Sequence, residues 1–402
     1  MKKKILVIGA GWEQAALIQE AKKQGHEIIA THPAMTPEGL ELADVFFVRD
    51  SRDIEAHLQI AKTYKVDAVL TDNCDYSFQT ASFVTKALGL PFAAIQSAKY
   101  SNNKYAQRVA CAKGEVTQPE FYLVENIEEV TAAANQLAYP LIMKPVDSRG
   151  TFGVTIVKNA EGLQNAFFDA MINSPSRRVI CEKFIKGTLV TVDGFCFKNG
   201  HQALTVASRV FIEGVKPVTK EIIYPAQFDD SVNEALLKNH NKVVKALDYQ
   251  YGHTHGEYIL TDKNEMYLVE CANRGGGVYT SSTIVPQLTG INLNEVLVNQ
   301  SLGQDDYIVS ASEKGYMTKS IILTFLDFEV GKVIKSLNVK ALEALDYVLH
   351  YRSVFDEKDM VESVQDCATR HSMLVLEGKD ASTAYLNLED FKSKMNVEYY
   401  DL

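Results

Sequence analysis

Residues 256–270 read GEYILTDKNEMYLVE, and this stretch indicates a β-hairpin with a carboxylate near each end. Two segments in which apolar and polar residues alternate flank Asp262-Lys263-Asn264, which is turn chemistry. A pairing centred on Lys263 and Asn264 places Glu257 directly opposite Glu270 on one face of a sheet. Opposed Cβ atoms lie roughly 5 Å apart, and like charges at that separation destabilise a sheet. We therefore expect a cation between the two carboxylates.

Two interpretations of this hairpin stay open. Carboxylates and substrate phosphates together hold a hard cation, so the first interpretation is a Mg²⁺ site that also receives a nucleotide. The second is a surface hairpin whose carboxylates are solvated or paired with Arg274, because structural ion-pair networks are common. Other parts of the sequence must decide between them.

Length and composition indicate a soluble protein of several domains. The 402 residues predict about two to four domains, and the contents of 46% hydrophobic and 23% charged residues are ordinary for globular proteins. A net charge of −10 argues against a nucleic-acid-binding protein, which needs a basic surface. Residues 1–10 lack the apolar core of a signal peptide, and no apolar run approaches the ~20 residues that span a bilayer. We expect a cytoplasmic protein without membrane contact.

The cysteines are scattered and include no Cys-x-x-Cys pair, which predicts buried free thiols and neither a zinc site nor a disulfide framework. They are Cys74, Cys111, Cys181, Cys196, Cys271 and Cys367.

Residues 1–97 alternate short apolar strands with helices, which predicts a doubly wound parallel sheet of the α/β class. Gly9 and Gly11 follow the first strand, but Gln14 stands where a dinucleotide fingerprint has its third glycine, so an NAD-dependent dehydrogenase is disfavoured. Asp72 and Asn73 end the fourth strand at the edge where such sheets bind ligands, although turn formation explains them equally well. The expected strands cover 4–8, 26–30, 45–48, 68–71 and 91–94, and the expected helices cover 13–24, 54–64 and 75–88.

The next segments contain candidate phosphate-binding residues. A helix expected over 98–112 carries Lys104, and Lys144 ends an apolar strand directly before the loop Ser148-Arg-Gly-Thr-Phe-Gly153. A lysine at a strand end beside a glycine-containing loop suits phosphate groups, although a plain hairpin turn needs no ligand. The loop lacks Gly-Lys-Ser/Thr, so a P-loop NTPase is disfavoured. Glu182-Lys-Phe-Ile185 ends a strand whose backbone could pair with an adenine, or is a simple edge strand.

Taken in order, these segments resemble the ATP-grasp superfamily of carboxylate–amine or carboxylate–thiol ligases, L-amino acid ligases among them, and biotin-carboxylase-like enzymes. The resemblance covers about residues 1–375. It rests on Asn102-Asn-Lys104, Leu141-Ile-Met-Lys144-Pro, the Ser148–Gly153 loop, Glu182–Ile185, His255-Gly-Glu257, and Glu270-Cys-Ala-Asn-Arg274 followed by three glycines.

The resemblance implies three domains. They are an N-terminal α/β domain over 1–97, an ATP-grasp domain of two α+β subdomains that grip ATP over 98–303, and a small C-terminal α+β domain over 304–402. The lid subdomain would cover about 114–184.

It also implies a role for each motif. ATP and Mg²⁺, with Mn²⁺ as a substitute, are the implied cofactors. Lys104 and Lys144 would bind the nucleotide phosphates, under the lid loop that holds Ser148, Gly150 and Gly153. The adenine clamp would be Glu182, Lys183, Phe184 and Ile185, the metal ligands Glu257, Glu270 and Asn273, and the phosphoryl-contacting residues Arg274 and, as a weaker candidate, Arg209.

The chain departs from the family pattern in two places. The pattern has asparagine two residues after the second metal glutamate, where this chain has Ala272, so either Asn273 or water would replace that ligand. The glutamate that often contacts ribose is absent near residues 188–191, and Asp193 is the candidate substitute. His253 and His255 flank the hairpin and are expected to orient the metal ligands, with a general base as the alternative.

The implied reaction joins a small-molecule carboxylate to an amine, or less readily to a thiol. ATP would phosphorylate the carboxylate, and the amine would then displace phosphate from the acyl-phosphate, giving an amide, ADP and phosphate. The glycine run Gly275–Gly277 and residues 278–282 are expected to line the acceptor pocket, because glycine lets backbone approach a substrate closely. The alternatives are a biotin-carboxylase-like or purine-pathway enzyme, and a non-catalytic ATP-binding sensor or scaffold. Symmetry preferences favour a homodimer.

Overall fold

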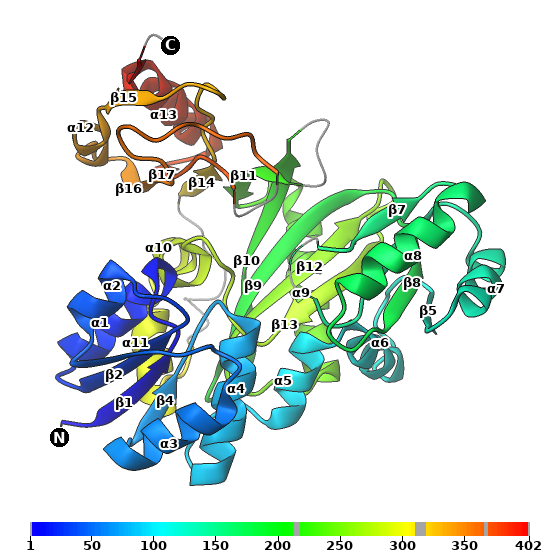
Figure 1. Cartoon of the computed structure of the whole chain (residues 1–402), viewed down its shortest axis with the longest axis horizontal. Helices are drawn as coiled ribbons and strands as arrows, with labels where there is room; N and C mark the ends of the chain where they lie inside the picture. The colour runs from blue at the N-terminus through cyan, green and yellow to red at the C-terminus, as the bar shows by residue number, and fades with distance from the viewer. Residues whose placement is uncertain are drawn as a thin grey trace.

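The computed structural model describes residues 2–148, 150, 152–212, 218–309, 319–365 and 369–400. Its N-terminal part is the predicted parallel sheet, with strand order β3-β2-β1-β4 (Figure 1). The elements are β1 (Lys4–Ile8), η1 (Trp12–Gln14), α1 (Ala15–Lys23), β2 (Glu27–His32), α2 (Pro37–Leu42), β3 (Val45–Val48), α3 (Ile54–Tyr64), β4 (Ala68–Leu70) and α4 (Asp75–Leu88).

The expected strand at 91–94 is wrong, because no strand forms there. Pro91 has no N–H to donate to a ladder, which weakens this short segment as a strand. The helix α11 (Leu293–Ser301), from a distant part of the chain, packs against α1 and β4 instead. Its residues Leu293, Val296 and Leu297 share one buried core with β1 and α1.

The single helix expected over 98–112 is also wrong, because the structure has two helices, α5 (Ile95–Asn102) and α6 (Lys104–Lys113). They are separated at Asn103, whose backbone is extended and whose Oδ1 accepts a hydrogen bond from the Ala106 N–H at 2.8 Å. The first N–H groups of a helix have no hydrogen-bond acceptor within the helix, and the side chain of an asparagine at the N-cap usually supplies one. The break makes Lys104 the first residue of α6.

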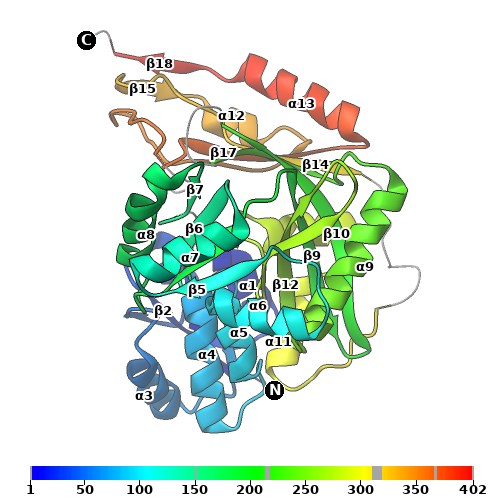
Figure 2. The same ribbon diagram turned by 90° about the vertical axis from the view of Figure 1, so that its right-hand side faces the viewer.

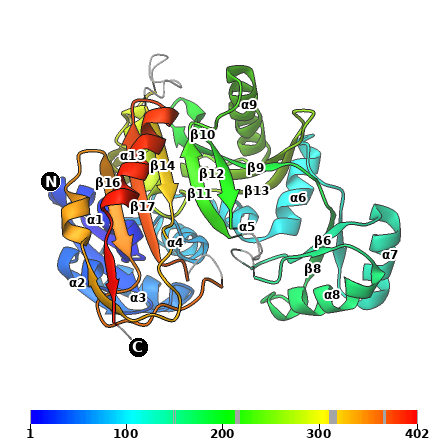
Figure 3. The ribbon, with the colours of Figure 1, turned by 90° about the horizontal axis from the view of Figure 1, so that it is seen from above.

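A four-stranded antiparallel sheet forms a separate lobe at the side of the molecule (Figure 3). Its order is β5-β8-β6-β7, and the helices α7 and α8 cover it with a hydrophobic core of its own. The lobe lies within the range expected for the lid subdomain, about 114–184, and its role as a lid stays a prediction. Its elements are β5 (Phe121–Val124), α7 (Ile127–Leu137), β6 (Leu141–Pro145), β7 (Thr155–Val157), η2 (Ala160–Gly162), α8 (Leu163–Ile172) and β8 (Val179–Lys183).

An eight-stranded antiparallel sheet, in the order β13-β12-β9-β10-β11-β14-β17-β16, is the centre of the fold. The sheet continues past the predicted boundary at 303/304, because β14 pairs with β11, β17 with β14, and β16 with β17. The strands are β9 (Thr188–Phe197), β10 (Gly200–Phe211), β11 (Thr219–Tyr224), β12 (Gly252–Leu260), β13 (Met266–Ala272), β14 (Ser320–Thr324), β16 (Val348–Ser353) and β17 (Ser372–Gly378).

The remaining elements pack around this sheet. The helix α9 (Asp230–Ala246) contacts β9, β10 and β13. Figure 2 shows the C-terminal elements at one end of the molecule and α3 and α4 at the other. Besides α9, the remaining elements are η3 (Thr280–Ile284), α10 (Val285–Thr289), β15 (Ile334–Leu337), α12 (Val339–Glu343), α13 (Ala381–Lys394) and β18 (Val397–Tyr399). Among the described residues, no helix is long and apolar enough to cross a membrane.

The hairpin predicted over residues 256–270 is β12–β13, and Glu257 lies opposite Glu270. The register arises differently from the prediction, since Ile259 pairs with Tyr267 about a turn centred on Lys263. An irregularity between Glu257 and Tyr258 then shifts the register and restores the opposition of the two glutamates. An extra residue in one strand of an antiparallel pair is how a β-bulge re-aims side chains beside functional sites.

Candidate active site

The two opposed carboxylates each contact a cation from a different element. The Lys104 Nζ lies 3.1 Å from the Glu270 Oε2, and the Arg209 Nη2 lies 2.8 Å from the Glu257 Oε1. The expected cation between the carboxylates is therefore supplied by side chains in this structure. Arg274, the partner considered in the surface-hairpin interpretation, is paired elsewhere.

These contacts set the protonation of the groups. Burial opposes the charge of Glu257, but Arg209 and His255 outweigh it and hold the pKa of Glu257 far below its usual range. Burial likewise opposes the charge of Lys104, yet the carboxylate of Glu270 raises its pKa above the ordinary value. Glu257 is thus ionised and Lys104 protonated at neutral pH.

The strand end that carries Lys144 belongs to a buried triad. The Lys144 Nζ lies 2.8 Å from the Glu182 Oε2, and the Arg108 Nε lies 2.8 Å from the Glu182 Oε1. All three side chains are at most 6% exposed. Burial lowers the pKa of Lys144 to about 8, against the raising effect of Glu182. Glu182, predicted to contact adenine, is thus occupied by two cations.

Arg108 is a residue that the sequence analysis missed. Besides Glu182 on β8, its Nη2 donates to the Val269 carbonyl at 2.8 Å, directly before Glu270 on β13. The neighbouring Gln107 bonds both backbone groups of Cys271, at 2.6 and 2.9 Å. One turn of α6 therefore connects the lid lobe with the strand that carries Glu270.

The predicted adenine clamp consists of the last two residues of β8 and the two residues that follow this strand. The N–H of Lys183 donates to the Glu120 carbonyl at 2.9 Å, and that of Phe184 to the Pro140 carbonyl at 3.2 Å. The N–H of Ile185 has no hydrogen-bond partner among the described residues, so it is the group here that can meet a ligand acceptor. Phe184 and Ile185 are both partly exposed.

The predicted lid loop begins against Lys104, whose Nζ donates to the Ser148 carbonyl at 3.0 Å. Gly150 and Gly153 have positive φ angles of 59° and 70°. A Cβ on Gly153 would come within 2.9 Å of both Asn173 and Pro145, so only glycine fits that position. Arg149 and Thr151, which complete the loop, lie outside the described residues.

Arg274 contacts the N-terminal domain. Its Nε and Nη2 donate to the two carboxylate oxygens of Asp75 at 2.7 and 3.0 Å, and its Nη1 donates to the Gly275 carbonyl. Glu270 and Glu257 lie close enough to share its field, since Glu270 raises the pKa of Arg274 and Arg274 lowers that of Glu257. Arg274 is therefore a fixed cation beside the two carboxylates.

Among the three predicted metal ligands, Asn273 is the one whose side chain does not join the opposed carboxylates. Its side chain is fully buried, and its Nδ2 donates to the carbonyls of Tyr251 and His253 at 2.6 and 2.9 Å. Successive side chains of a strand point to opposite faces, so a residue three positions after Glu270 faces the other side of the sheet. The expectation that Asn273 replaces the family's asparagine as a metal ligand needs this correction.

His255 and Ala272 pair across the hairpin on its carboxylate face. Because the side chain of Ala272 is small, the ring of His255 occupies the space there. Its Nδ1 lies 2.7 Å from the Asp193 Oδ1, and its Nε2 lies 3.9 Å from the Glu257 Oε1. Burial disfavours the charged ring, but Asp193 and Glu257 raise the pKa of His255 to about 9. Asp193, the candidate ribose ligand, thus orients His255 beside Glu257. The other histidine of the hairpin, His253, has its pKa lowered by burial.

The glycine run after Arg274 is bonded to the carboxyl edge of the N-terminal sheet. The carboxylate of Asp72 accepts from the Gly275 N–H at 2.8 Å and from the Ser281 hydroxyl at 2.6 Å, and Asn73 donates to the Gly276 carbonyl. Asp72 and Asn73 were predicted either to bind a ligand or to form a turn. In the structure, both residues instead make hydrogen bonds between domains.

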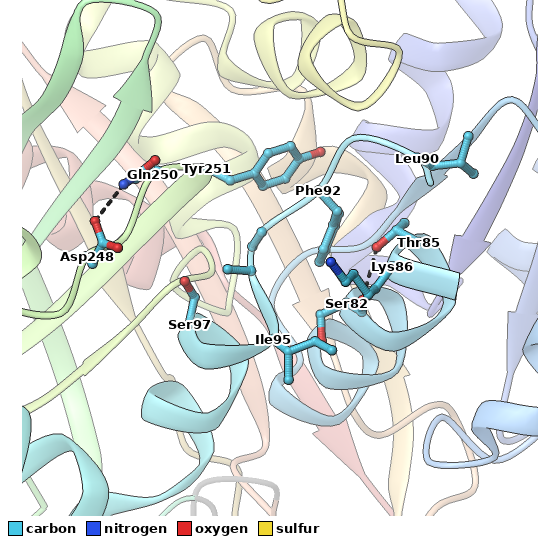
Figure 4. A pocket seen from close by; sticks show the side chains of 12 residues that line it. Ser82, Thr85, Lys86, Leu90, Phe92, Ile95, Ser97, Asp248, Gln250 and Tyr251 are labelled. Atoms are coloured by element: carbon cyan, nitrogen blue, oxygen red, sulfur yellow. Dashed lines mark hydrogen bonds between the residues drawn. The ribbon is translucent and has the colours of Figure 1, made fainter. Parts of the chain in front are cut away.

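A separate cavity of about 420 Å³ lies where α4 and α5 meet the start of β12. Figure 4 shows Tyr251 beside Phe92 at this cavity, with Asp248 bonded to Gln250. None of the predicted site residues lines it.

A lid sheet and a large antiparallel sheet, with opposed carboxylates and flanking lysines, define an ATP-grasp protein. Residues 102–305 match the sequence profile described as "Carbamoyl-phosphate synthase L chain, ATP binding domain", and the chain belongs to this family. The predicted family is thereby confirmed.

Two curated relatives match part of the chain. A formate-dependent phosphoribosylglycinamide formyltransferase of Prochlorococcus marinus is 27% identical over 215 residues, covering 50% of this chain and 55% of that protein. An alanine–anticapsin ligase of Bacillus amyloliquefaciens is 23% identical over 266 residues, covering 61% and 56%. The chain thus spans about half the length of the curated relatives that it matches.

Among solved structures, the L-amino acid ligase of Bacillus licheniformis superposes with a TM-score of 0.83. It is 16% identical, and the match covers 100% of this chain and 99% of that one. At this identity the likeness shows the fold, and it confirms the predicted α/β ATP-grasp architecture.

Proposed function

We propose that this chain is an ATP-dependent ligase that activates a carboxylate as an acyl-phosphate and transfers the acyl group to an amine, releasing ADP and phosphate. The observation that carries the proposal is the charge arrangement at the β12–β13 hairpin. Two opposed carboxylates, each paired with a cation, lie within the field of a third cation, Arg274. Membership of an ATP-binding family supports ATP as the nucleotide substrate.

The donor set fits Mg²⁺. That ion usually takes one or two protein carboxylates together with substrate phosphates and water. Glu257 and Glu270 offer two carboxylates on one face, and no larger cluster of metal-binding side chains occurs in the described part of the chain. When bound, Mg²⁺ would neutralise phosphate charge, and Glu257 and Glu270 would hold it.

The chain's own cations would do the rest of the electrostatic work. Phosphoryl transfer needs positioning and charge neutralisation more than covalent help from the protein. Lys104 and Arg209 would exchange their carboxylate partners for phosphate oxygens, and Lys144 would contact the phosphates from the lid side. Arg274 would meet charge that develops on the transferring group. The carboxylate oxygen attacks the γ-phosphorus, ADP leaves, and the amine later displaces phosphate from the acyl carbon.

Formate activation is a second candidate. The Prochlorococcus relative is named for a formate-dependent formyl transfer to phosphoribosylglycinamide, and formate is itself a carboxylate. Both candidates share the acyl-phosphate step and differ in the size of the acyl group. A panel that contains formate, acetate and amino acids separates them.

The test is a hydroxylamine-trapping screen of the purified protein with ATP, Mg²⁺ and that carboxylate panel. We expect at least one carboxylate to give a hydroxamate together with an equal amount of ADP. The Glu270→Gln variant serves as the matched inactive control. ATP binding without ADP or hydroxamate formation for every carboxylate would refute the proposal and leave the sensor or scaffold alternative.

A further inference from the structure

The strand that carries Glu270 lies at the edge of the large sheet. The sheet order begins β13-β12, so β13 has a neighbouring strand on one side only in the described part of the chain. An edge strand leaves a row of N–H and C=O groups without partners in the sheet. Along the outer edge of β13, earlier segments of the chain supply those partners. The bonds join the Leu268 N–H to the Thr117 carbonyl at 3.0 Å, the Arg108 Nη2 to the Val269 carbonyl at 2.8 Å, the Tyr249 hydroxyl to the Cys271 carbonyl at 3.0 Å, and the Asn273 N–H to the Ser101 hydroxyl at 2.8 Å.

The side chain of Gln107, on α6, bonds this edge in the way a neighbouring strand would. Its Nε2 donates to the Cys271 carbonyl at 2.6 Å, and its Oε1 accepts from the Cys271 N–H at 2.9 Å. Paired residues of two antiparallel strands exchange N–H···O bonds in the same reciprocal way. The Nε2 also donates to the Tyr100 carbonyl at 3.0 Å, so both amide hydrogens and the amide oxygen are used.

These contacts lie on both sides of Glu270 along the strand. The register of the hairpin leaves Val269 without a paired residue in β12, and such a bulge locally disrupts the hydrogen-bond ladder. Arg108 bonds the carbonyl of Val269, directly before Glu270. Gln107 bonds both backbone groups of Cys271, directly after it. Two adjacent residues of one helix therefore hold the backbone of Glu270 at the irregular point of the hairpin.

The same helix carries the lysine that contacts Glu270. The Lys104 Nζ lies 3.1 Å from the Glu270 Oε2, and Lys104 is the first residue of α6. Helix residues three and four apart lie on one face, so Lys104, Gln107 and Arg108 all face β13. The helix thus contacts the side chain of Glu270 through Lys104 and the backbone beside it through Gln107 and Arg108. The spacing between Lys104 and Glu270 therefore depends on how α6 is fixed to β13.

Gln107 acts on the geometry of the site and not on its charge. Its side chain is uncharged and 2% exposed, so it changes neither the field at Glu270 nor the surface that a substrate meets. Arg108, in contrast, also neutralises Glu182, so its loss would disturb the lid lobe as well. A change at Gln107 therefore separates the position of the Glu270 backbone from the charges around it.

We infer that Gln107 is a positioning residue that fixes the backbone of Glu270 relative to Lys104. The inference rests on the proposed function, in which Glu270 holds Mg²⁺ and Lys104 binds a phosphate, and it adds the residue that sets their spacing. Groups that orient metal ligands without touching the metal typically matter about 10- to 100-fold in metal affinity or activity. Without the two bonds to Cys271, the edge of β13 would be free to shift, and Glu270 would lose its fixed position.

The test compares Gln107→Met with Gln300→Met, since methionine has a similar length and forms none of the amide's strong hydrogen bonds. Gln300 is the matched control, because it is 4% exposed, accepts from the Gly252 N–H at 2.9 Å and donates to the Cys196 carbonyl at 3.0 Å. Calorimetry measures the ADP affinity of each protein with and without Mg²⁺. We expect the gain in ADP affinity that Mg²⁺ gives to fall about 10-fold or more in Gln107→Met and to stay at the wild-type level in Gln300→Met. The metal-free ADP affinity should be unchanged in both variants.

Urea denaturation separates positioning from a purely structural role. We expect both variants to lose stability and only Gln107→Met to lose the Mg²⁺ gain. Equal Mg²⁺ gains in all three proteins, or an equal loss in both variants, would overturn the inference. The ADP measurement needs no turnover, so a loss confined to Gln107→Met supports the inference even if no hydroxamate is formed, in which case only the proposed reaction fails. Gln107→Asn is the second variant, in case Gln107→Met does not fold, and its shorter amide should cause a smaller loss in the same direction.

Discussion

Arg108→Met tests whether the buried triad connects the lid lobe to the carboxylate hairpin. The change keeps the length of an apolar stem and removes three hydrogen bonds, two to Glu182 and one to the Val269 carbonyl. Removing one partner of a buried ion pair costs about 3–5 kcal/mol. Because Lys144 still neutralises Glu182, we expect a loss near the lower limit, about 3 kcal/mol in the free energy of unfolding.

Urea denaturation followed by circular dichroism measures this loss. Arg178→Met is the control, since Arg178 forms an exposed pair with Glu125, and we expect a loss below about 1 kcal/mol. The double variant Arg108→Met/Glu182→Gln completes a cycle, for which we expect a coupling energy above about 1 kcal/mol. A loss for Arg108→Met no larger than that of the control would refute the reasoning.

Three further predictions concern charge. Glu270→Gln should lower kcat by a factor of order 10² or more while leaving metal-free ATP binding intact. A turnover assay measures kcat, and calorimetry measures ATP binding. Turnover near the wild-type rate would make the hairpin structural. Arg274→Ala should lower kcat and kcat/KM together with little change in ATP affinity. Arg274→Lys should restore little of the activity, because one ammonium cannot replace the two bonds to Asp75. A parallel loss of ATP binding in these variants would contradict this prediction. Burial lowers the pKa of His201 to about 4 and that of His240 below its usual value, so the unfolded chain binds more protons between pH 6.5 and 4. The contribution of His201 to stability should therefore be full above pH 6.5 and fall by about 3 kcal/mol as the pH drops through that window, and a flat profile from pH 7 to 4.5 would exclude this account.

The opposed glutamates show what sequence periodicity can deliver. Alternation along two strands and turn chemistry between them predicted the hairpin and the opposition of Glu257 and Glu270, which the structure reaches through a register shift. The irregularity next to Tyr258 could not be predicted from the sequence. A hairpin loop with an even number of residues, and a loop with an odd number followed by one extra residue in a strand, have the same local sequence pattern. The same alternation, applied one step further, would have excluded Asn273 from the carboxylate face.

Long-range partners account for most of what the sequence did not reveal. Arg108 contacts Glu182, 74 residues later, and Val269, 161 residues later, and a helix residue carries no local sign of either contact. The extension of the large sheet by β14, β17 and β16 depends on pairing between distant strands, which local patterns do not specify. Asn103, in contrast, was visible in the sequence as a helix N-cap residue before Lys104.

Isotope transfer tests the central claim most directly. A carboxylate that the hydroxylamine screen identifies is supplied with ¹⁸O in both oxygens, together with ATP, Mg²⁺ and hydroxylamine. If the carboxylate oxygen attacks the γ-phosphorus, the released phosphate contains one ¹⁸O atom for each hydroxamate formed, and the nucleotide product is unlabelled ADP. Release of ¹⁸O-labelled AMP, or of phosphate without ¹⁸O, would contradict the acyl-phosphate mechanism.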